Sequence, residues 1–244
     1  MDKIWTFNNN IMKYGNSAMV TGSAEPPGPP LPSDMHFLYL ANDYNGTYIQ
    51  NRAINSGIGS YQRQGSLTKY GNGSNCYISA DGWDDMLCVS LDNNDLELMK
   101  GLNNVYTFFI RVYNNAGDYD NPGGIISWRY QGDGYIYMIR SSGNQLQIHL
   151  NGGIDTGLLL TADTVYKIAV SLSFFGAYDL YGPHMWSTTG GPYERDMGNI
   201  MTTFNEGSGY SPYMERFYGI AGIARVTTRE EDMAIASVLM NQTV

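Results

Sequence analysis

Between residues 216 and 240 the spacing of apolar residues changes from a period of two to a helical period. In the first half, two alternating sets of residues would occupy opposite faces of an extended strand: Ile220, Gly222, Ala224 and Val226 on one face, and Ala221, Ile223 and Arg225 on the other. Both faces are mostly apolar, and only Arg225 needs water or a charged partner. The pattern therefore predicts a strand that is buried on both sides.

A short helix is predicted directly after this strand. Thr228 and Glu231 have the spacing of a capping box, in which a hydroxyl and a carboxylate satisfy the free backbone N–H groups of a helix start. The apolar side of this helix would consist of Met233, Ala236, Val238, Leu239 and Met240. We expect this side to pack over the preceding strand.

The rest of the chain reads as short strands joined by tight turns. Apolar runs that suit strands or a hairpin lie at residues 105–113, 124–128, 135–151 and 164–171. The 29 glycines and 20 tyrosines fit this pattern, because Gly tolerates left-handed backbone and Tyr favours pleated surfaces. With 244 residues, 43% of them hydrophobic, the chain is long enough for one large β domain with a real core, or for two small ones.

The strand and helix at residues 216–240 resemble the end of concanavalin A-like and laminin G-like jelly rolls, where F-x-G-x-I-x-x-V leads into R-x-L-x-x-x-E-I. Gly222 and Ala224 replace an acidic pair that many of these domains carry. The four apolar runs follow the family's order, and residues 65–78 follow its outline G-x-A-L-x-F-x-G-x-x-x-Y-V. The resemblance implies an all-β fold, a two-sheet antiparallel jelly-roll sandwich over residues 35–244 with a short C-terminal helix.

The N-terminal region differs in composition from this body. Residues 1–22 contain two apolar segments, at 4–7 and 18–20, that are too small to be stable alone and are predicted to form a β docking segment. Residues 23–34 form a linker whose prolines favour an extended, semi-rigid backbone. Two interpretations stay open, an edge hairpin on the same domain or docking on another chain, because both use the same unpaired backbone groups.

Charge and hydropathy narrow the choice of partners. The formal net charge of −9 opposes binding to nucleic acid, which needs clustered Lys and Arg. No apolar run is long enough for membrane insertion, and the start lacks the apolar core of a signal peptide. A docking segment, a proline spacer and a jelly roll together resemble modular surface proteins of bacteriophage virions. The resemblance implies a location at a virion surface, or outside the cell after cytoplasmic synthesis.

The two cysteines fall in neighbouring predicted strands. An acidic turn at residues 81–85 joins these strands and would let Cys76 and Cys88 face each other. Without a signal peptide, we expect buried free thiols, and a disulfide is the alternative.

Catalytic patterns are incomplete. Endoglucanases of this fold carry Glu-x-Asp-x-x-Glu, whose outer carboxylates act as nucleophile and acid/base. Here Glu194 and Asp196 are followed by Asn199, which cannot deliver a proton. None of the three histidines stands in a recognisable triad or zinc-site context: His36, His149 and His184. We expect no catalytic residues and no enzyme, with a glycoside hydrolase on the same fold as the alternative.

Calcium is the one cofactor that the sequence leaves open. Residues 118–123 loosely imitate an EF-hand loop and would offer Asp118 and Asp120 as ligands. However, Pro122 occupies a ligand position, and Arg129 stands where the closing Glu should be. A plain acidic surface turn is the alternative, although laminin G-like domains often hold one calcium at their rim.

Aromatic residues supply the strongest binding signal. The segment 174–213 is long for a strand connection and is rich in Tyr, Gly and Pro, and a second cluster of this type lies at residues 129–135. Flat rings stack on the C–H groups of sugars while polar side chains bond the hydroxyls. We expect ligand contacts from Arg129, Tyr130, Asp133, Tyr178, His184, Trp186, Tyr193 and Arg195. For any one of these, burial in the core or in a subunit interface is the alternative.

These patterns favour a non-catalytic binding module. Its partner would be a glycan or a host-surface receptor, and residues 1–22 would attach it to a larger assembly such as a virion. Homo-oligomers fit the same architecture. A purely structural assembly protein, whose aromatic loops are buried against copies of itself, is the alternative.

Overall fold

The computed structural model of the protein describes the backbone of residues 6–7, 10–11, 30–80, 85–101, 105–112, 123–130, 133–142, 145–150, 153–159, 163–171, 174–180, 185–189, 199–204 and 216–244. Side chains are described for residues 30–80, 85–101, 105–111, 125–128, 163–171, 180, 199–203 and 216–244.

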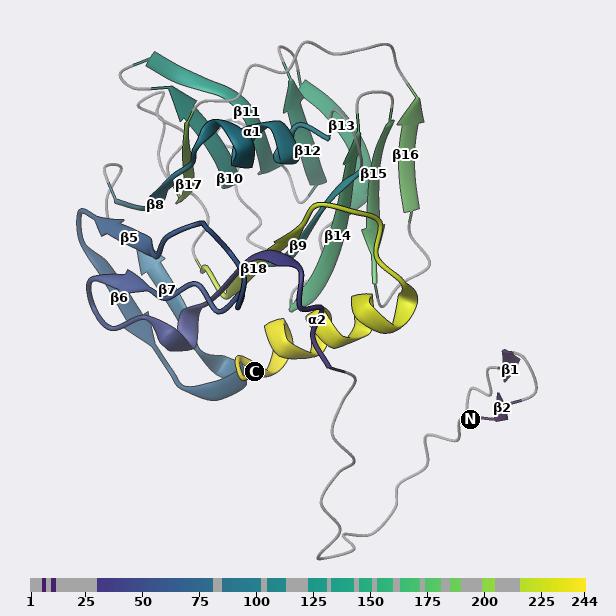
Figure 1. The fold of residues 1–244 in the computed structure, drawn as a ribbon, viewed down its shortest axis with the longest axis horizontal. Coiled ribbons are helices and arrows are strands. Elements are labelled where there is room, and N and C mark those ends of the chain that lie inside the picture. The colour runs from purple at the N-terminus through teal and green to yellow at the C-terminus, as the bar shows by residue number, and fades with distance from the viewer. Residues whose placement is uncertain are drawn as a thin grey trace, which may run out of the picture.

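Two large antiparallel sheets form the body (Figure 1). The first has the strand order β16 (Met185–Thr189), β15 (Phe174–Asp179), β14 (Thr164–Ser171), β9 (Tyr106–Val112), β18 (Gly219–Ile223) and β3 (Met35–Leu40). The second has the order β13 (Gly153–Leu159), β12 (Gln145–Leu150), β11 (Asp133–Ser142), β10 (Gly123–Tyr130), β17 (Ile200–Phe204), β8 (Met86–Ser90), β5 (Tyr61–Gln64) and β4 (Tyr48–Ile49).

The smaller elements complete the fold. Two hairpins stand outside the large sheets: β1 (Thr6–Phe7) with β2 (Asn10–Ile11), and β6 (Leu67–Tyr70) with β7 (Tyr77–Ala80). The helical elements are η1 (Ala41–Asp43), η2 (Gly73–Asn75), α1 (Asn93–Met99) and α2 (Arg229–Asn241). The expected all-β antiparallel sandwich with a short C-terminal helix is confirmed.

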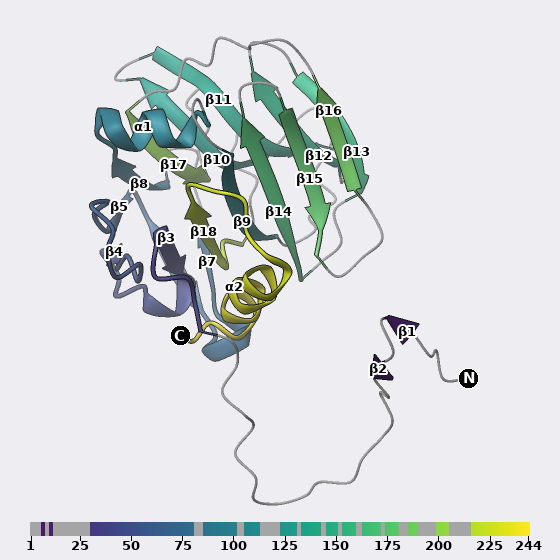
Figure 2. The same ribbon diagram turned by 45° about the vertical axis from the view of Figure 1, so that its right-hand side comes forward.

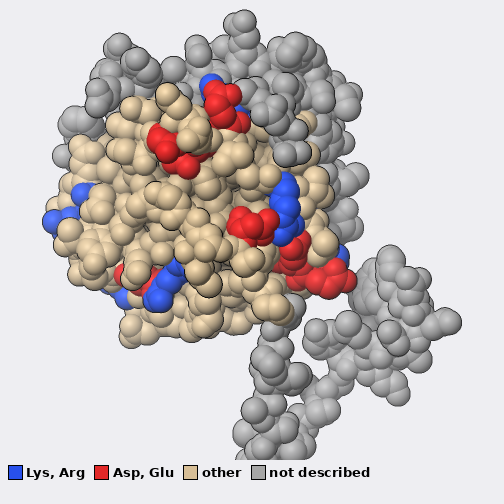
Figure 3. All heavy atoms as spheres, viewed as in Figure 1, with Lys and Arg blue, Asp and Glu red and all other residues tan. Residues whose placement is uncertain are grey.

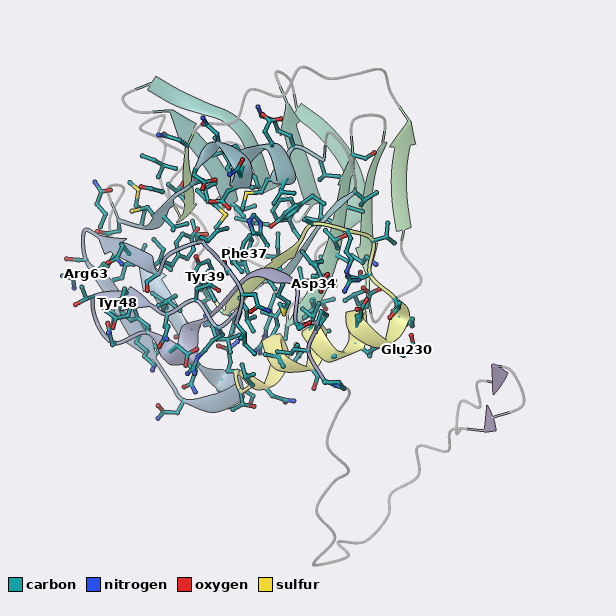
Figure 4. The ribbon with its side chains drawn as sticks, in the orientation of Figure 1. Asp34, Phe37, Tyr39, Tyr48, Arg63 and Glu230 are labelled. Atoms are coloured by element: carbon teal, nitrogen blue, oxygen red, sulfur yellow. The ribbon has the colours of Figure 1, made fainter. Side chains whose placement is uncertain are left out.

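The main core lies between the two sheets and is strongly aromatic. Phe37 and Phe108 from the six-stranded sheet meet Trp128 from the eight-stranded sheet, and all three are buried. The rings of Phe108 and Trp128 meet edge to face with centroids 5.3 Å apart. Helix α1 closes this core, because its Met99 is buried and its sulfur accepts a hydrogen bond from Nε1 of Trp128 at 3.3 Å. Figure 4 shows Phe37 among the interior side chains.

A second apolar layer lies on the outer face of the six-stranded sheet. Strand β18 is buried along its whole length between β9 and β3. Ile220 belongs to the core between the sheets, whereas Ala221 and Ile223 pack with Ile235 and Leu239 of α2. Figures 1 and 2 show α2 lying across this sheet. The predicted strand, buried on both sides and covered by the following helix, is confirmed.

The start of α2 also follows the prediction. Thr228 is the N-cap, its hydroxyl accepts from the backbone N–H of Glu231, and the Glu231 carboxylate accepts from the backbone N–H of Thr228. Ile235, which the apolar-side prediction omitted, is fully buried, while Met233 is only half-buried. The buried side is therefore centred nearer to Ile235 than the spacing suggested.

The end of β18 is where the prediction fails. The strand stops at Ile223, and Val226 is 63% exposed instead of buried. The Arg225 guanidinium donates to Asp34 at 2.6 and 2.9 Å and to Glu231 at 2.8 and 2.7 Å. These bonds hold the chain at the surface directly after the strand, so Val226 cannot continue the apolar face. Figure 3 shows acidic and basic side chains lying side by side on this face of the protein.

The cysteines do not lie on paired strands. β7 pairs with β6, whereas β8 pairs with β5 and β17, so the expected face-to-face arrangement is wrong. Neither cysteine forms a disulfide; Cys76 is buried and Cys88 is half-buried. Burial raises the pKa of the Cys76 thiol.

Two further regions differ from or fall outside the predictions. The segment 174–213 is not one long connection, because it contains β15, β16 and β17, and β17 lies in the opposite sheet between β10 and β8. Most of residues 1–29 lie outside the described residues, and the boundaries 1–22, 23–34 and 35–244 stay predictions. In the described part of the chain, no helix is long and apolar enough to cross a membrane.

Candidate functional site

The predicted ligand residues are divided between the two sheets. The backbones of Arg129 and Tyr130 end β10, and Tyr130 pairs with Asp133 at the start of β11 in the eight-stranded sheet. Tyr178 of β15 pairs with Met185 at the edge of the six-stranded sheet. Trp186 of β16 follows directly and pairs with Ala177.

This division splits the predicted set into two groups. One is the hairpin end of β10 and β11, and the other is the outer pair β15–β16. The remaining predicted residues lie outside the described residues: His184, Tyr193, Arg195, Asp118 and Asp120. Their roles in ligand or calcium binding stay predictions.

The structure points to a site that the sequence analysis missed. On the β6–β7 hairpin, Tyr70 pairs with Tyr77, and their rings stack with centroids 5.1 Å apart and planes 18° apart. The Tyr77 ring also contacts Tyr218, with centroids 5.9 Å apart and planes 52° apart. We call Tyr70, Tyr77 and Tyr218 the tyrosine stack. It runs from the surface inward, since Tyr70 is 46% exposed, Tyr77 is half-buried and Tyr218 is buried.

Two arginines lie over the rings of the tyrosine stack. The guanidinium carbon of Arg216 lies 4.6 Å from the centroid of Tyr77, and that of Arg111 lies 4.1 Å from the centroid of Tyr218. Both distances are typical of cation–π contacts. Burial raises the pKa of Tyr218, and a hydrogen bond with Arg216 partly opposes this shift.

Arg111 fixes the inner end of the tyrosine stack. Its Nη1 donates to the carbonyl oxygens of Ser74 at 2.8 Å and Met240 at 2.9 Å, and its Nη2 pairs with Asp163 at 3.2 Å. The side chain of Arg111 is almost fully buried. The Arg111 guanidinium therefore links the β6–β7 turn, the end of α2 and the Tyr218 ring. These contacts hold Tyr218, the inner ring of the tyrosine stack, in a fixed position.

The outer face of the hairpin combines rings with hydroxyl groups. Leu67 and Ile78 are buried on the inner face, so the alternating register places Thr68 and Ser79 on the same face as Tyr70 and Tyr77. The turn contains Gly71 at φ +70°, a conformation that favours glycine. Flat rings, hydroxyls and a guanidinium on one small surface are the groups that bind sugar rings.

A weak signal for this site is present in the sequence. Tyr70 and Tyr77 flank residues 71–75, which read Gly-Asn-Gly-Ser-Asn and predict a turn. Assigning the two flanking segments as a hairpin would have paired the tyrosines. The approach of Arg111 and Arg216 had no sequence signal, because both lie far away along the chain.

A second cluster of ionisable groups lies around His36 on β3. Its Nδ1 lies 2.8 Å from the hydroxyl of Tyr106, and its Nε2 lies 2.9 Å from Oδ1 of Asp95. Asp95 is also the N3 residue of the α1 capping box. Tyr106 is fully buried, and burial raises the pKa of its hydroxyl well above the usual value. The Tyr106 hydroxyl is thus sealed in the core, and the hydrogen bonds of the three residues connect β3, β9 and α1.

The described acidic groups do not form a metal site. Within the described ranges, no group of three or more His, Cys, Asp or Glu side chains is close enough to hold a metal ion. Asp85, from the acidic turn at residues 81–85, is buried and accepts a hydrogen bond from the backbone N–H of Ser66. Its carboxylate therefore stabilises the turn before β6.

Comparisons with known sequences give no relative: no protein-family model and no curated protein matches the chain. Solved structures match it by fold. The sialidase of Trypanosoma rangeli, in complex with 2,3-difluorosialic acid, aligns with 88% of this chain and 34% of its own, at a TM-score of 0.60 and 10% identity. This chain thus spans about a third of the length of that sialidase.

Two further structures match over a larger share of their own length. Domain 4 of AbnA, a GH43 extracellular arabinanase from Geobacillus stearothermophilus in complex with arabinotriose, aligns with 83% of this chain and 98% of its own, at a TM-score of 0.59 and 8% identity. The binding domain of botulinum neurotoxin serotype D/C aligns with 84% and 52%, at a TM-score of 0.53 and 12% identity. At these identities the likeness shows the fold: the chain has a β-sandwich that it shares with an arabinanase domain, a toxin binding domain and part of a sialidase.

Proposed function

We propose that the protein is a non-catalytic carbohydrate-binding module and that the tyrosine stack is its binding surface. The observation that carries the proposal is that the exposed Tyr70 ring stacks on Tyr77. The Arg216 guanidinium lies over the Tyr77 ring, and the buried Tyr218 contacts the same ring. A ring held in place before the ligand arrives loses little conformational freedom on binding. The ligand would stack a sugar ring on Tyr70 and bond the nearby hydroxyl and guanidinium groups.

The fold comparisons support a binding function in general. The arabinanase domain was solved with arabinotriose, and the neurotoxin domain is a binding domain. Both cover most of this chain at similar TM-scores, so the same sandwich serves recognition in proteins of unrelated sequence.

The proposal extends to where the module acts. Residues 1–22 would attach it to a larger assembly such as a virion, and the sandwich would present the tyrosine stack to a host-surface glycan. Two features support this part: the apolar N-terminal segments and the proline-rich linker.

A glycan array probed with the labelled full-length protein tests the function. The wild-type protein should bind a defined group of glycans, and Tyr70→Ala should weaken binding of the best one at least about 5-fold in calorimetry, because ring stacking contributes about 1 kcal/mol or more. Tyr70→Phe keeps the ring and should retain most of the affinity.

Tyr48→Ala is the matched control. Tyr48 is 37% exposed on β4, near Arg63 at the edge of the eight-stranded sheet (Figure 4), and none of the described side chains stacks on its ring. This variant should bind like the wild type. Absence of any glycan hit, or equal binding by Tyr70→Ala, would refute the proposed site. Release of reducing sugar from a polysaccharide panel would refute the non-catalytic assignment.

A further inference from the structure

An apolar groove lies beside α2 at the point where the linker meets the body. It has a volume of about 620 Å³ and is bounded by residues 30–32, by residues 52–54 and by the outer side of α2. In Figure 1 the described chain of the body begins, in purple, beside α2. Leu31 and Val238 are half-buried and pack against the apolar layer beneath, while Ile54 on the rim is 89% exposed.

The groove wall formed by the linker is held in place. The Asn55 side chain donates to the carbonyl oxygen of Ser33 at 2.9 Å, and the next residue, Asp34, is bonded by Arg225. The chain upstream of Pro32 therefore starts from a fixed position on the groove's own edge.

The sequence upstream offers an apolar segment that suits the groove. Ala18, Met19 and Val20 stand between polar and glycine residues, and the linker separates them from Pro30. Prolines at 26, 27, 29, 30 and 32 favour an extended backbone, and the nine residues 21–29 would span roughly 28 Å at about 3.1 Å per residue. Such a span lets Met19 and Val20 reach a neighbouring molecule, whereas a return to the groove at the linker's own end would require the chain to reverse direction within these nine residues.

We propose that residues 18–20 of one copy of the chain dock in the α2 groove of a second copy. The exchange covers Ile54 and the outer side of Val238 and leaves each copy with one donated segment and one filled groove. Reciprocal exchange closes a two-fold dimer, and a one-way exchange extends a chain of copies. Both products fit a module that is displayed in several copies on a larger assembly.

Site-directed crosslinking tests the pairing in the full-length chain. A Val20→Cys chain mixed with an Ile54→Cys chain should form a disulfide-linked dimer under mild oxidation. A mixture of Val20→Cys with Val226→Cys is the matched control, because Val226 is an exposed valine outside the groove. The expected yield is at least about 10-fold above this control, since the groove pair is held together by docking.

The double variant Val20→Cys/Ile54→Cys separates the two modes of docking. An intrachain disulfide in a monomer would overturn the proposal, because the segment would then fill the groove of its own chain. Equal crosslinking of the Ile54→Cys and Val226→Cys mixtures would also overturn it.

Self-association gives an independent readout. In light scattering, Ile54→Asp should raise the dissociation constant between copies at least about 10-fold, because a charge then replaces an apolar contact, while Val226→Asp should leave it unchanged. A wild-type protein that stays monomeric at every concentration measured would overturn the proposal. These measurements involve no glycan, so their outcome is separate from the test of the tyrosine stack.

Discussion

The tyrosines of the core and those of the tyrosine stack are the same residue type in opposite surroundings. In the core, Tyr39 and Tyr61 stack with centroids 4.8 Å apart and planes 27° apart. The Tyr39 hydroxyl donates to the carbonyl oxygen of Gly59 at 2.6 Å, and the Tyr61 hydroxyl lies 2.8 Å from that of Thr203. Both rings are buried, so each hydroxyl has a fixed partner inside the protein.

In the tyrosine stack the ring geometry is similar but exposure increases outward. Tyr70 and Tyr77 lie 5.1 Å apart, close to the separation in the core pair, yet Tyr70 is exposed. Stacking in the core therefore contributes to folding, while stacking at the surface leaves Tyr70 46% exposed to solvent. The abundance of tyrosine in this chain does not distinguish these two settings; the exposure of Tyr70 and the Arg216 guanidinium over Tyr77 do.

Removal of a core ring should give the largest effect on stability. Tyr61→Ala should lower the free energy of unfolding by about 3–5 kcal/mol, because it deletes a buried aromatic side chain and leaves a cavity. Tyr61→Phe keeps the ring and should cost about 1 kcal/mol for the lost hydrogen bond. Urea unfolding of the three proteins measures both values, and a loss below 1 kcal/mol for Tyr61→Ala would contradict the core position of this ring.

The second largest effect on the free energy of unfolding should come from alkaline pH, which acts through the buried core tyrosines. Burial raises the pKa of Tyr39, Tyr61 and Tyr106 above the usual value of about 10. Their neutral form is thus favoured in the folded state, so the stability they contribute is complete below pH 10 and is lost as the pH rises above it. Each should cost about 1.4 kcal/mol per pH unit until its folded pKa is reached.

Phenolate absorbance combined with urea unfolding at pH 9 and pH 11 checks this prediction. Tyr61→Phe is the control, since it should reduce the slope of stability against pH by the contribution of one proton. Ionisation of every tyrosine in the folded protein near pH 10 would contradict it.

Local patterns predicted the elements that one stretch of sequence specifies. Residues 164–171 and 105–113 were predicted as core strands and became β14 and β9, because a continuous apolar run identifies a strand buried on both faces. The capping box of α2 was equally predictable from the sequence, because Thr228 and Glu231 interact within one helical turn. Such features need no knowledge of the rest of the chain.

Long-range features could not be predicted in this way. The end of β18 depends on Arg225 meeting Asp34, which lies 191 residues away in the chain. The tyrosine stack depends on Arg111 and Tyr218 reaching the β6–β7 hairpin from two other parts of the fold. Periodicity carries no information on such long-range contacts, and local composition alone favours Tyr178 and Trp186 over Tyr70.

The smallest expected effect on stability belongs to the outer ring of the tyrosine stack. Tyr70→Ala should lower the free energy of unfolding by about 0.5–1 kcal/mol, because it removes the stacking contact with Tyr77 but leaves no enclosed cavity. Tyr218→Ala, at the buried end of the same stack, should cost about 3 kcal/mol or more, since the Arg111 guanidinium then loses the ring it covers. Urea unfolding of both variants beside the wild type measures the gradient. Equal losses for the two variants would mean that Tyr70 supports the fold as Tyr218 does, and the stack would then have no free face for a ligand.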